Sequence, residues 1–92
     1  MRLVWTLGAR LDRLAIFNFI ANDNVTAAIA LDELFDQKAI LLMAMPSVGR
    51  KGRMAKTREW VVHPNYLLIY RVRLKDDLIE IVRVTRAAQQ WP

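Results

Sequence analysis

Pro46 divides the chain into two parts that follow different residue patterns. The 21 residues from Val25 to Met45 contain neither glycine nor proline, the two residues that most strongly disfavour a helix interior. After Pro46 come short apolar and β-branched runs, separated by turn-forming pairs such as Pro64-Asn65 and typical of strands. Helices followed by consecutive strands predict an α+β domain.

Two helices are expected before Pro46. The first covers "ARLDRLAIFNFIAND", where Leu11, Leu14, Ala15 and Phe19 recur at helical spacing. "NDN" at 22–24 ends this helix and caps the next, because short polar side chains accept hydrogen bonds from the amides of a first turn. The short link makes the two helices antiparallel. The second helix is expected to bury a stripe of Ala27, Ala28, Leu31, Leu34, Phe35 and Ile40.

Strands are expected at "RLVWT" near the N-terminus and at "REWVVH", "YLLIYRVRL" and "LIEIVRVTR" after Pro46. The last three are joined by tight connections and form an antiparallel meander. The order is therefore β-α-α-β-β-β, with two antiparallel helices packed on one face of a small antiparallel sheet. Ninety-two residues are enough for one such domain, spanning residues 1–92.

Alternation along the strands places arginines on one face of this sheet. Arg71 and Arg73 share a face with Leu67 and Ile69 in the second run of the meander. In the third run, Val82 and Val84 share one face and Arg83 and Thr85 share the other. One face of the sheet is thus expected to carry arginines.

Positive charge is concentrated in the second half. Residues 1–45 hold four Lys/Arg and five Asp/Glu, whereas residues 46–92 hold ten and four, so the net charges are −1 and +6. The segment "GRKGRMAKTR", residues 49–58, is expected to form a loop or an irregular lead into a strand, and it contains no acidic residue. Its cations are Arg50, Lys51, Arg53, Lys56 and Arg58. This charge predicts a polyanionic partner, either nucleic acid or an acidic protein.

Several classes of function are disfavoured. "GRKGR" lacks the spacing and the following helix of a phosphate-binding P-loop. Without cysteine and with His63 as the single histidine, neither a metal nor a cofactor is expected. One serine and one histidine make a serine-type triad improbable, and the apolar runs are too short to span a bilayer. We expect a cytoplasmic protein without a membrane partner.

The cationic loop and sheet could support two activities. They could bind a phosphate backbone, or they could stabilise the charged transition state of metal-independent phosphodiester cleavage. His63 could act as a general base, or it could be a turn residue without a catalytic role. Trp60 and Trp91 could stack on bases, while Trp60 could equally be a core or partner-facing residue.

Four segments together resemble the RelE/ParE superfamily of type II toxin-antitoxin toxins. They are "IANDNVTAA", "GRKGR", "TREWVVHPNYLLIYRV" and "IEIVRVTRAAQQWP", which cover most of the chain in the family's order. The resemblance implies the same β-α-α-β-β-β fold and a cognate antitoxin in a hetero-oligomeric complex. The RelE branch of this superfamily cleaves mRNA on the ribosome, and the ParE branch acts on DNA gyrase.

The resemblance also implies a set of site residues. In the RelE-type reading, Arg58 and Arg83 stabilise the scissile phosphate and Arg86 assists the leaving group. The residues expected to bind RNA are Arg50, Lys51, Arg53, Lys56 and Arg71.

The chain departs from the nuclease pattern at several positions. Leu67 stands where ribonuclease toxins carry an arginine, Arg86 replaces the family histidine, and Val25 replaces a proline. The C-terminal tyrosine of those toxins has no counterpart unless Trp91 serves. Three hypotheses therefore remain: a ribosome-dependent mRNA endonuclease, a gyrase inhibitor that contacts its target through the C-terminal strand and tail, and a protein that binds only its antitoxin.

Overall fold

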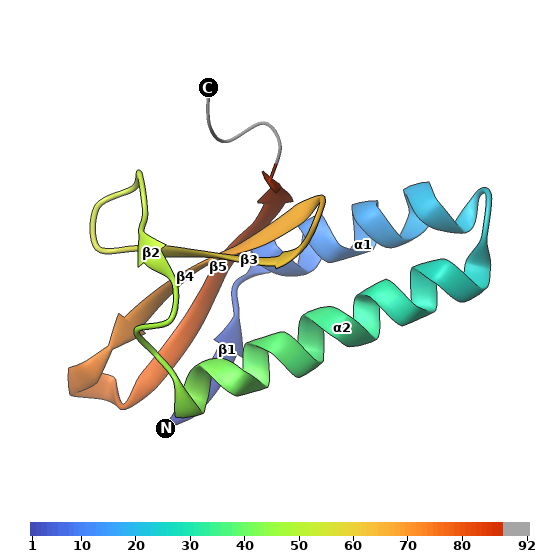
Figure 1. The fold of residues 1–92 in the computed structure, drawn as a ribbon. Helices are drawn as coiled ribbons and strands as arrows, with labels where there is room; N and C mark the ends of the chain where they lie inside the picture. Colours follow the sequence, from blue (N-terminus) through green and yellow to red (C-terminus); the bar gives the residue numbers. More distant parts are fainter. Residues whose placement is uncertain (88–92) are drawn as a thin grey trace.

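A computed structural model describes residues 1–87 of the chain, and its order of elements is the predicted one with a short additional strand (Figure 1). The elements are β1 (Arg2–Trp5), α1 (Leu7–Ala21), α2 (Val25–Ala44), β2 (Arg50–Lys51), β3 (Arg58–His63), β4 (Tyr66–Arg73), the 3₁₀ turn η1 (Leu74–Asp76) and β5 (Leu78–Arg86). The α+β fold with two helices on one sheet is confirmed.

The sheet is mixed rather than wholly antiparallel. Its strand order is β1-β5-β4-β3-β2, and every neighbouring pair is antiparallel except β1 and β5, which are parallel. A parallel pair needs a long crossover connection, and here the two helices and the following strands supply it. The expected loop at 49–58 contributes the two-residue strand β2 at the far edge.

Both helices begin at a residue whose side chain caps the first turn. Asn24 Oδ1 accepts a hydrogen bond from Ala27 N at 3.0 Å, as the "NDN" segment predicted. Thr6 Oγ1 accepts from Ala9 N at 3.1 Å, so α1 has a cap that we did not expect from the sequence. Each cap satisfies an amide that the helix itself leaves unpaired.

The core lies between the helices and the sheet, and α2 supplies most of its helical part. Its buried residues are Ala28, Leu31, Phe35, Ala39 and Leu42. Much of the expected stripe is therefore correct, but Ala27 and Ile40 are exposed. The spacing of apolar residues along α2 did not single out one face, because apolar residues surround much of the helix.

The predicted apolar stripe of α1 faces solvent. Leu11, Leu14 and Phe19 are 55%, 56% and 69% exposed, whereas Ala9 is buried and Ile16 and Ile20 pack against the core. A polar residue decides this orientation: the Arg13 side chain lies between the helices, with Nε 2.9 Å from Asp32 Oδ1. Its guanidinium also stacks on the Trp5 ring at 4.5 Å.

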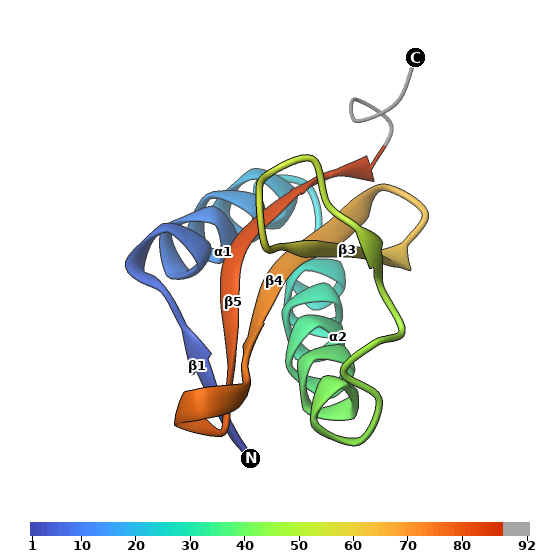
Figure 2. The same cartoon turned by 90° about the vertical axis from the view of Figure 1, so that its left-hand side faces the viewer.

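A β-bulge in β5 changes the expected pattern of faces. Tyr70 pairs with Ile81 and the adjacent Ile69 pairs with Arg83, so Val82 has no partner in β4. Val84 is buried with the core, and Val82 is only partly buried. The prediction that Val82 and Val84 share a face is therefore wrong, because one extra residue restarts the alternation. Beyond the end of β1, the free side of β5 lies beside α1 (Figure 2).

Candidate functional site

The basic segment after β2 is a tightly bonded loop. Gly52 N donates to Thr57 O at 2.8 Å, and Thr57 Oγ1 donates to Met54 O at 2.7 Å. Arg53 N donates to Glu59 Oε2 at 3.1 Å, and both Thr57 and Glu59 are buried. These bonds hold the backbone of residues 52–57 in one conformation.

The two glycines of "GRKGR" are explained by close packing. A β-carbon at Gly49 would lie 2.7 Å from Tyr70 Oη and 3.0 Å from Glu59 O. At Gly52 it would lie 2.3 Å from Thr57 Oγ1. The distances of 2.7 Å at Gly49 and 2.3 Å at Gly52 are too short for a carbon atom. Only glycine therefore fits at these positions without displacing its neighbours. The glycines therefore serve the fold and do not form a phosphate cradle.

Arg58 holds the segment that follows α2. Its Nη1 atom donates to Gly49 O at 2.7 Å. Tyr70 Oη donates to Pro46 O at 2.8 Å and accepts from Gly49 N at 2.9 Å, so the two side chains fasten the same turn. Burial raises the pKa of Tyr70 above its usual value and keeps the phenol protonated.

Arg83 forms a bidentate ion pair with Asp12 of α1. The distances are 2.7 Å from Nε to Oδ2 and 2.9 Å from Nη2 to Oδ1. Val84 N also donates to Oδ2, at 2.9 Å. The hydrogen bonds and charge of Asp12 raise the pKa of Arg83, so Arg83 is a paired cation at the edge of the sheet.

The three arginines predicted to be catalytic do not converge in the structure. Arg58 pairs with Tyr70 and Arg83 pairs with Ile69, the next residue along β4, so the two arginines stand on opposite faces. Arg86 pairs with Tyr66, the first residue of β4, whereas Arg58 pairs near the middle of that strand.

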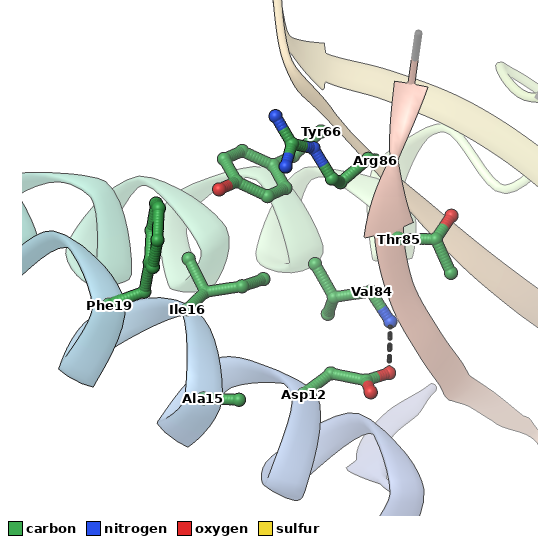
Figure 3. Close-up of a pocket in the computed structure, with 8 residues that line it drawn as sticks. All are labelled: Asp12, Ala15, Ile16, Phe19, Tyr66, Val84, Thr85 and Arg86. Carbon is green, nitrogen blue, oxygen red and sulfur yellow. Dashed lines mark hydrogen bonds between the residues drawn. The ribbon is translucent and has the colours of Figure 1, made fainter. Parts of the chain in front are cut away.

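Arg86 lies at the mouth of an apolar groove between α1 and the end of β5 (Figure 3). The groove has a volume of about 250 Å³ and is lined by Asp12, Ala15, Ile16, Phe19, Tyr66, Val84, Thr85 and Arg86. Figure 3 shows the Arg86 side chain reaching over Tyr66, while Thr85 points away. The groove thus combines an exposed aromatic ring, Phe19, with a cation.

The residues predicted to bind RNA fall into two groups. Arg50 and Arg53 flank the buried Glu59, by strand pairing and by the backbone bond described above. Lys51, Lys56 and Arg71 line two hollows that meet beside Val72. Arg73 and Lys75 belong with the second group. The sequence pattern that could have identified Arg73 and Lys75 is the alternation of Arg71, Arg73 and Lys75 after a buried strand.

The remaining candidates have structural contacts. His63 Nδ1 accepts from Asn65 N at 3.1 Å within the turn between β3 and β4. Trp60 is half-buried, with Lys38 Nζ 5.6 Å from its ring centre. Trp91 lies outside the described residues. Within residues 1–87, no three histidine or carboxylate side chains gather in a way that could hold a metal ion.

Comparison with known sequences decides the family. The sequence profile described as "ParE toxin of type II toxin-antitoxin system, parDE" matches residues 3–91. The chain belongs to the ParE toxin family. This ParE-family chain is 36% identical, over 94 residues, to "Putative toxin Y4kP" of Sinorhizobium fredii (strain NBRC 101917 / NGR234). That alignment covers 99% of the chain and 93% of the relative.

Two solved structures share the fold of this chain. The ParE-family chain matches a protein of the "Chromosomal ParDE TA system from P. aeruginosa" with a TM-score of 0.80 and 22% identity, covering 94% of this chain and 95% of the other. It matches the "YoeB/ParE toxin from Agrobacterium tumefaciens" with a TM-score of 0.66 and 21% identity, covering 94% and 98%. These two likenesses support the fold. In the described part of this toxin, no helix has the length and apolar character to cross a bilayer.

Proposed function

We propose that this toxin arrests growth by binding DNA gyrase and cleaves no RNA. The observation that carries the proposal is the set of contacts made by Arg58 and Arg83. The nuclease hypothesis requires these two side chains to stabilise the scissile phosphate. One is bonded to Gly49 O and the other to Asp12, on opposite faces of the sheet. The resemblance to the ParE branch implies gyrase as the target.

Metal-independent phosphodiester cleavage requires donors that converge on one point before the reaction begins. To reach a common phosphate, Arg83 would have to break its bidentate ion pair with Asp12. Arg58 would have to give up its hydrogen bond to Gly49 O. The candidate bases near Arg58 are poorly placed. Tyr70 is kept protonated by burial, and His63 lies at the opposite end of β3. Glu59 points to the opposite face of β3 and accepts from Arg53 N. This arrangement favours a toxin that acts by binding.

The contact surface that we assign to gyrase is the C-terminal part of β5 with the groove beside α1. Phe19 is 69% exposed on one wall, and Arg86 stands at the mouth (Figure 3). Exposed aromatic and arginine side chains beside an apolar pocket are typical of the residues that dominate protein interfaces. The tail beyond residue 87, which we also predicted to contact gyrase, lies outside the described residues.

A cognate antitoxin completes the proposal. Family membership and the likeness to a protein from a ParDE system support a toxin that is held inactive by a partner protein in a hetero-oligomer. An antitoxin that covers the groove beside α1 would block the surface assigned to gyrase. Silencing would then require no chemistry at the toxin.

The test separates binding from cleavage in one host. The toxin is induced in a bacterial host, translated messages are mapped by primer extension, and the purified toxin is added to a gyrase supercoiling assay. We expect growth arrest with intact messages and inhibition of supercoiling. Translation-dependent cuts within codons, lost in an Arg58→Ala, Arg83→Ala variant, would overturn the proposal in favour of the mRNA endonuclease.

Two matched variants test the surface. Phe19→Ala and Leu7→Ala each remove one large side chain that is well exposed, at 69% and 71%, but Leu7 lies at the start of α1, away from the groove. Phe19→Ala should weaken gyrase inhibition at least tenfold, because a central interface anchor is worth about 2 kcal/mol or more. Leu7→Ala should inhibit like the parent. Equal inhibition by both variants would contradict the assigned surface.

A further inference from the structure

A second surface, separate from the groove beside α1, gathers the positive charge of the toxin. Two hollows of about 410 and 330 Å³ lie between the loop after β2 and the end of β4, and both are lined by Lys56 and Val72. We call them together the basic groove. Its cationic residues are Lys51, Lys56, Arg58, Arg71, Arg73 and Lys75.

Carboxylates do not neutralise this groove. Asp76 lies 3.2 Å from Arg73 Nε. Glu80 lies at the longer distances of 3.6 Å from Arg71 and 3.9 Å from Arg73. Within residues 1–87, no carboxylate forms an ion pair with Lys51, Lys56 or Lys75. Six cations therefore face two carboxylates, and three of the cations are free to meet an external anion.

The groove is preorganised by the loop bonds already described. Lys56 has a φ of 62°, a left-handed conformation that residues with a β-carbon rarely adopt. The bonds from Gly52 N and Thr57 Oγ1 hold the loop on either side of it. Backbone strain of this kind persists only where the surroundings enforce it, and it is concentrated at functional sites. Lys56, held in this way, lines both hollows.

The lining of the groove indicates the class of anion. The apolar residues that line it are small or aliphatic, Ala55, Val72 and Leu74. None of the described lining residues is aromatic, so the groove lacks both the anchors of a protein interface and the platforms on which unpaired bases stack. Spread lysines and arginines without such anchors fit a regular row of phosphates.

We propose that the basic groove binds the phosphodiester backbone of double-stranded DNA. The preference for DNA over RNA rests on the proposed function, because DNA gyrase acts on duplex DNA. The preference for a phosphate backbone rests only on the groove. A toxin bound to gyrase through Phe19 and Arg86 would then use a different surface to contact the DNA that the enzyme carries.

The test measures binding to the free toxin, without gyrase, so that its result is independent of the proposed function. A labelled 20-base-pair duplex of arbitrary sequence is titrated by fluorescence anisotropy between 50 and 200 mM salt. The groove variant is Lys56→Gln, Lys75→Gln. The control is Arg10→Gln, Lys38→Gln, which removes two charges on the helices, outside the groove, and leaves the same net charge as the groove variant.

The parent should bind with an affinity that falls as salt rises, in proportion to the phosphates contacted. The groove variant should lose about two units of the slope of log affinity against log salt, about one for each phosphate contact removed. The control should keep most of that slope. Equal losses in the two variants would overturn the proposal, because affinity would then follow net charge alone.

Two further titrations distinguish double-stranded DNA from other anions. A 20-nucleotide single-stranded RNA that binds the groove while the duplex does not would overturn the assignment to DNA. Poly-glutamate that binds at the groove in place of the duplex would show an acidic protein surface as its partner and would also overturn it. Circular dichroism of both variants confirms that the comparison is made between folded proteins.

Discussion

At the scale of single residues, several functional-looking positions prove to be structural. "GRKGR" combines two glycines with three cations, but Gly49 and Gly52 are required because Tyr70 and Thr57 approach their backbone closely. Arg58 donates to the same segment. Lys51, Lys56 and Lys75, in contrast, form no ion pair within residues 1–87. A sequence shows that a residue is charged, but only its neighbours show whether that charge is already used.

Gly49 and Gly8 should respond to substitution by alanine in opposite directions. Gly49→Ala places a carbon 2.7 Å from Tyr70 Oη in a buried site and should destabilise the fold by about 1–3 kcal/mol, as overpacking does. A β-carbon at Gly8 would lie 3.2 Å from Cδ of the half-exposed Arg83 side chain and at an ordinary contact distance of 3.6 Å from Val82 O. Because alanine favours a helix by about 0.5–1 kcal/mol over glycine, Gly8→Ala should be neutral or stabilising. Urea denaturation of both variants measures the difference, and equal destabilisation would contradict this account.

At the scale of elements, α1 carries an apolar stripe on the side that faces solvent. Helical spacing identified the stripe but could not show which side would meet the sheet. Ala9, Ile16 and Ile20 face the core instead, because Asp12 and Arg13 must reach partners on β5 and α2. The exposed stripe leaves α1 with apolar surface that helps to form the groove beside β5.

Substitutions on the two sides of α1 should therefore differ in cost. Leu11→Ala should change the free energy of unfolding by no more than about 0.5 kcal/mol, as exposed substitutions usually do. Ile16→Ala should cost about 2–4 kcal/mol, since its side chain packs on the core. Thermal unfolding of both variants gives the comparison. A larger loss for Leu11→Ala would mean that the predicted stripe, and not the observed one, packs against the sheet.

At the scale of the whole molecule, the first and last elements close the fold on each other. β1 pairs in parallel with β5, and Thr6 Oγ1 donates to Val82 O at 2.8 Å just beyond that pairing. Asp12 continues the same seam by accepting from Arg83 and from Val84 N. The extra residue at the β5 bulge lies at this seam, where the neighbour of β5 changes from β1 to α1.

Asp12 should consequently matter more for stability than Arg83. Asp12→Ala leaves the partly buried Val84 N–H without its acceptor and should cost about 1–3 kcal/mol. Arg83→Ala should cost no more than about 1 kcal/mol, because the Arg83 side chain is 51% exposed and the ion pair is screened by water. Urea denaturation at pH 7 compares the two. If Arg83→Ala cost as much as Asp12→Ala, the ion pair rather than the backbone acceptor would hold the seam.

The sequence by itself determined the order of elements, the Asn24 cap, most of the buried stripe of α2 and the family resemblance. These depend on spacing within one element or on motifs read along the chain. Only the tertiary structure decided the parallel β1–β5 pair, the side of α1 that is buried and the arginines that remain available to a partner. Asp12 and Arg83 lie 71 positions apart, and no local pattern shows that they meet. Local spacing specifies elements, whereas contacts between distant residues select the faces that function can use.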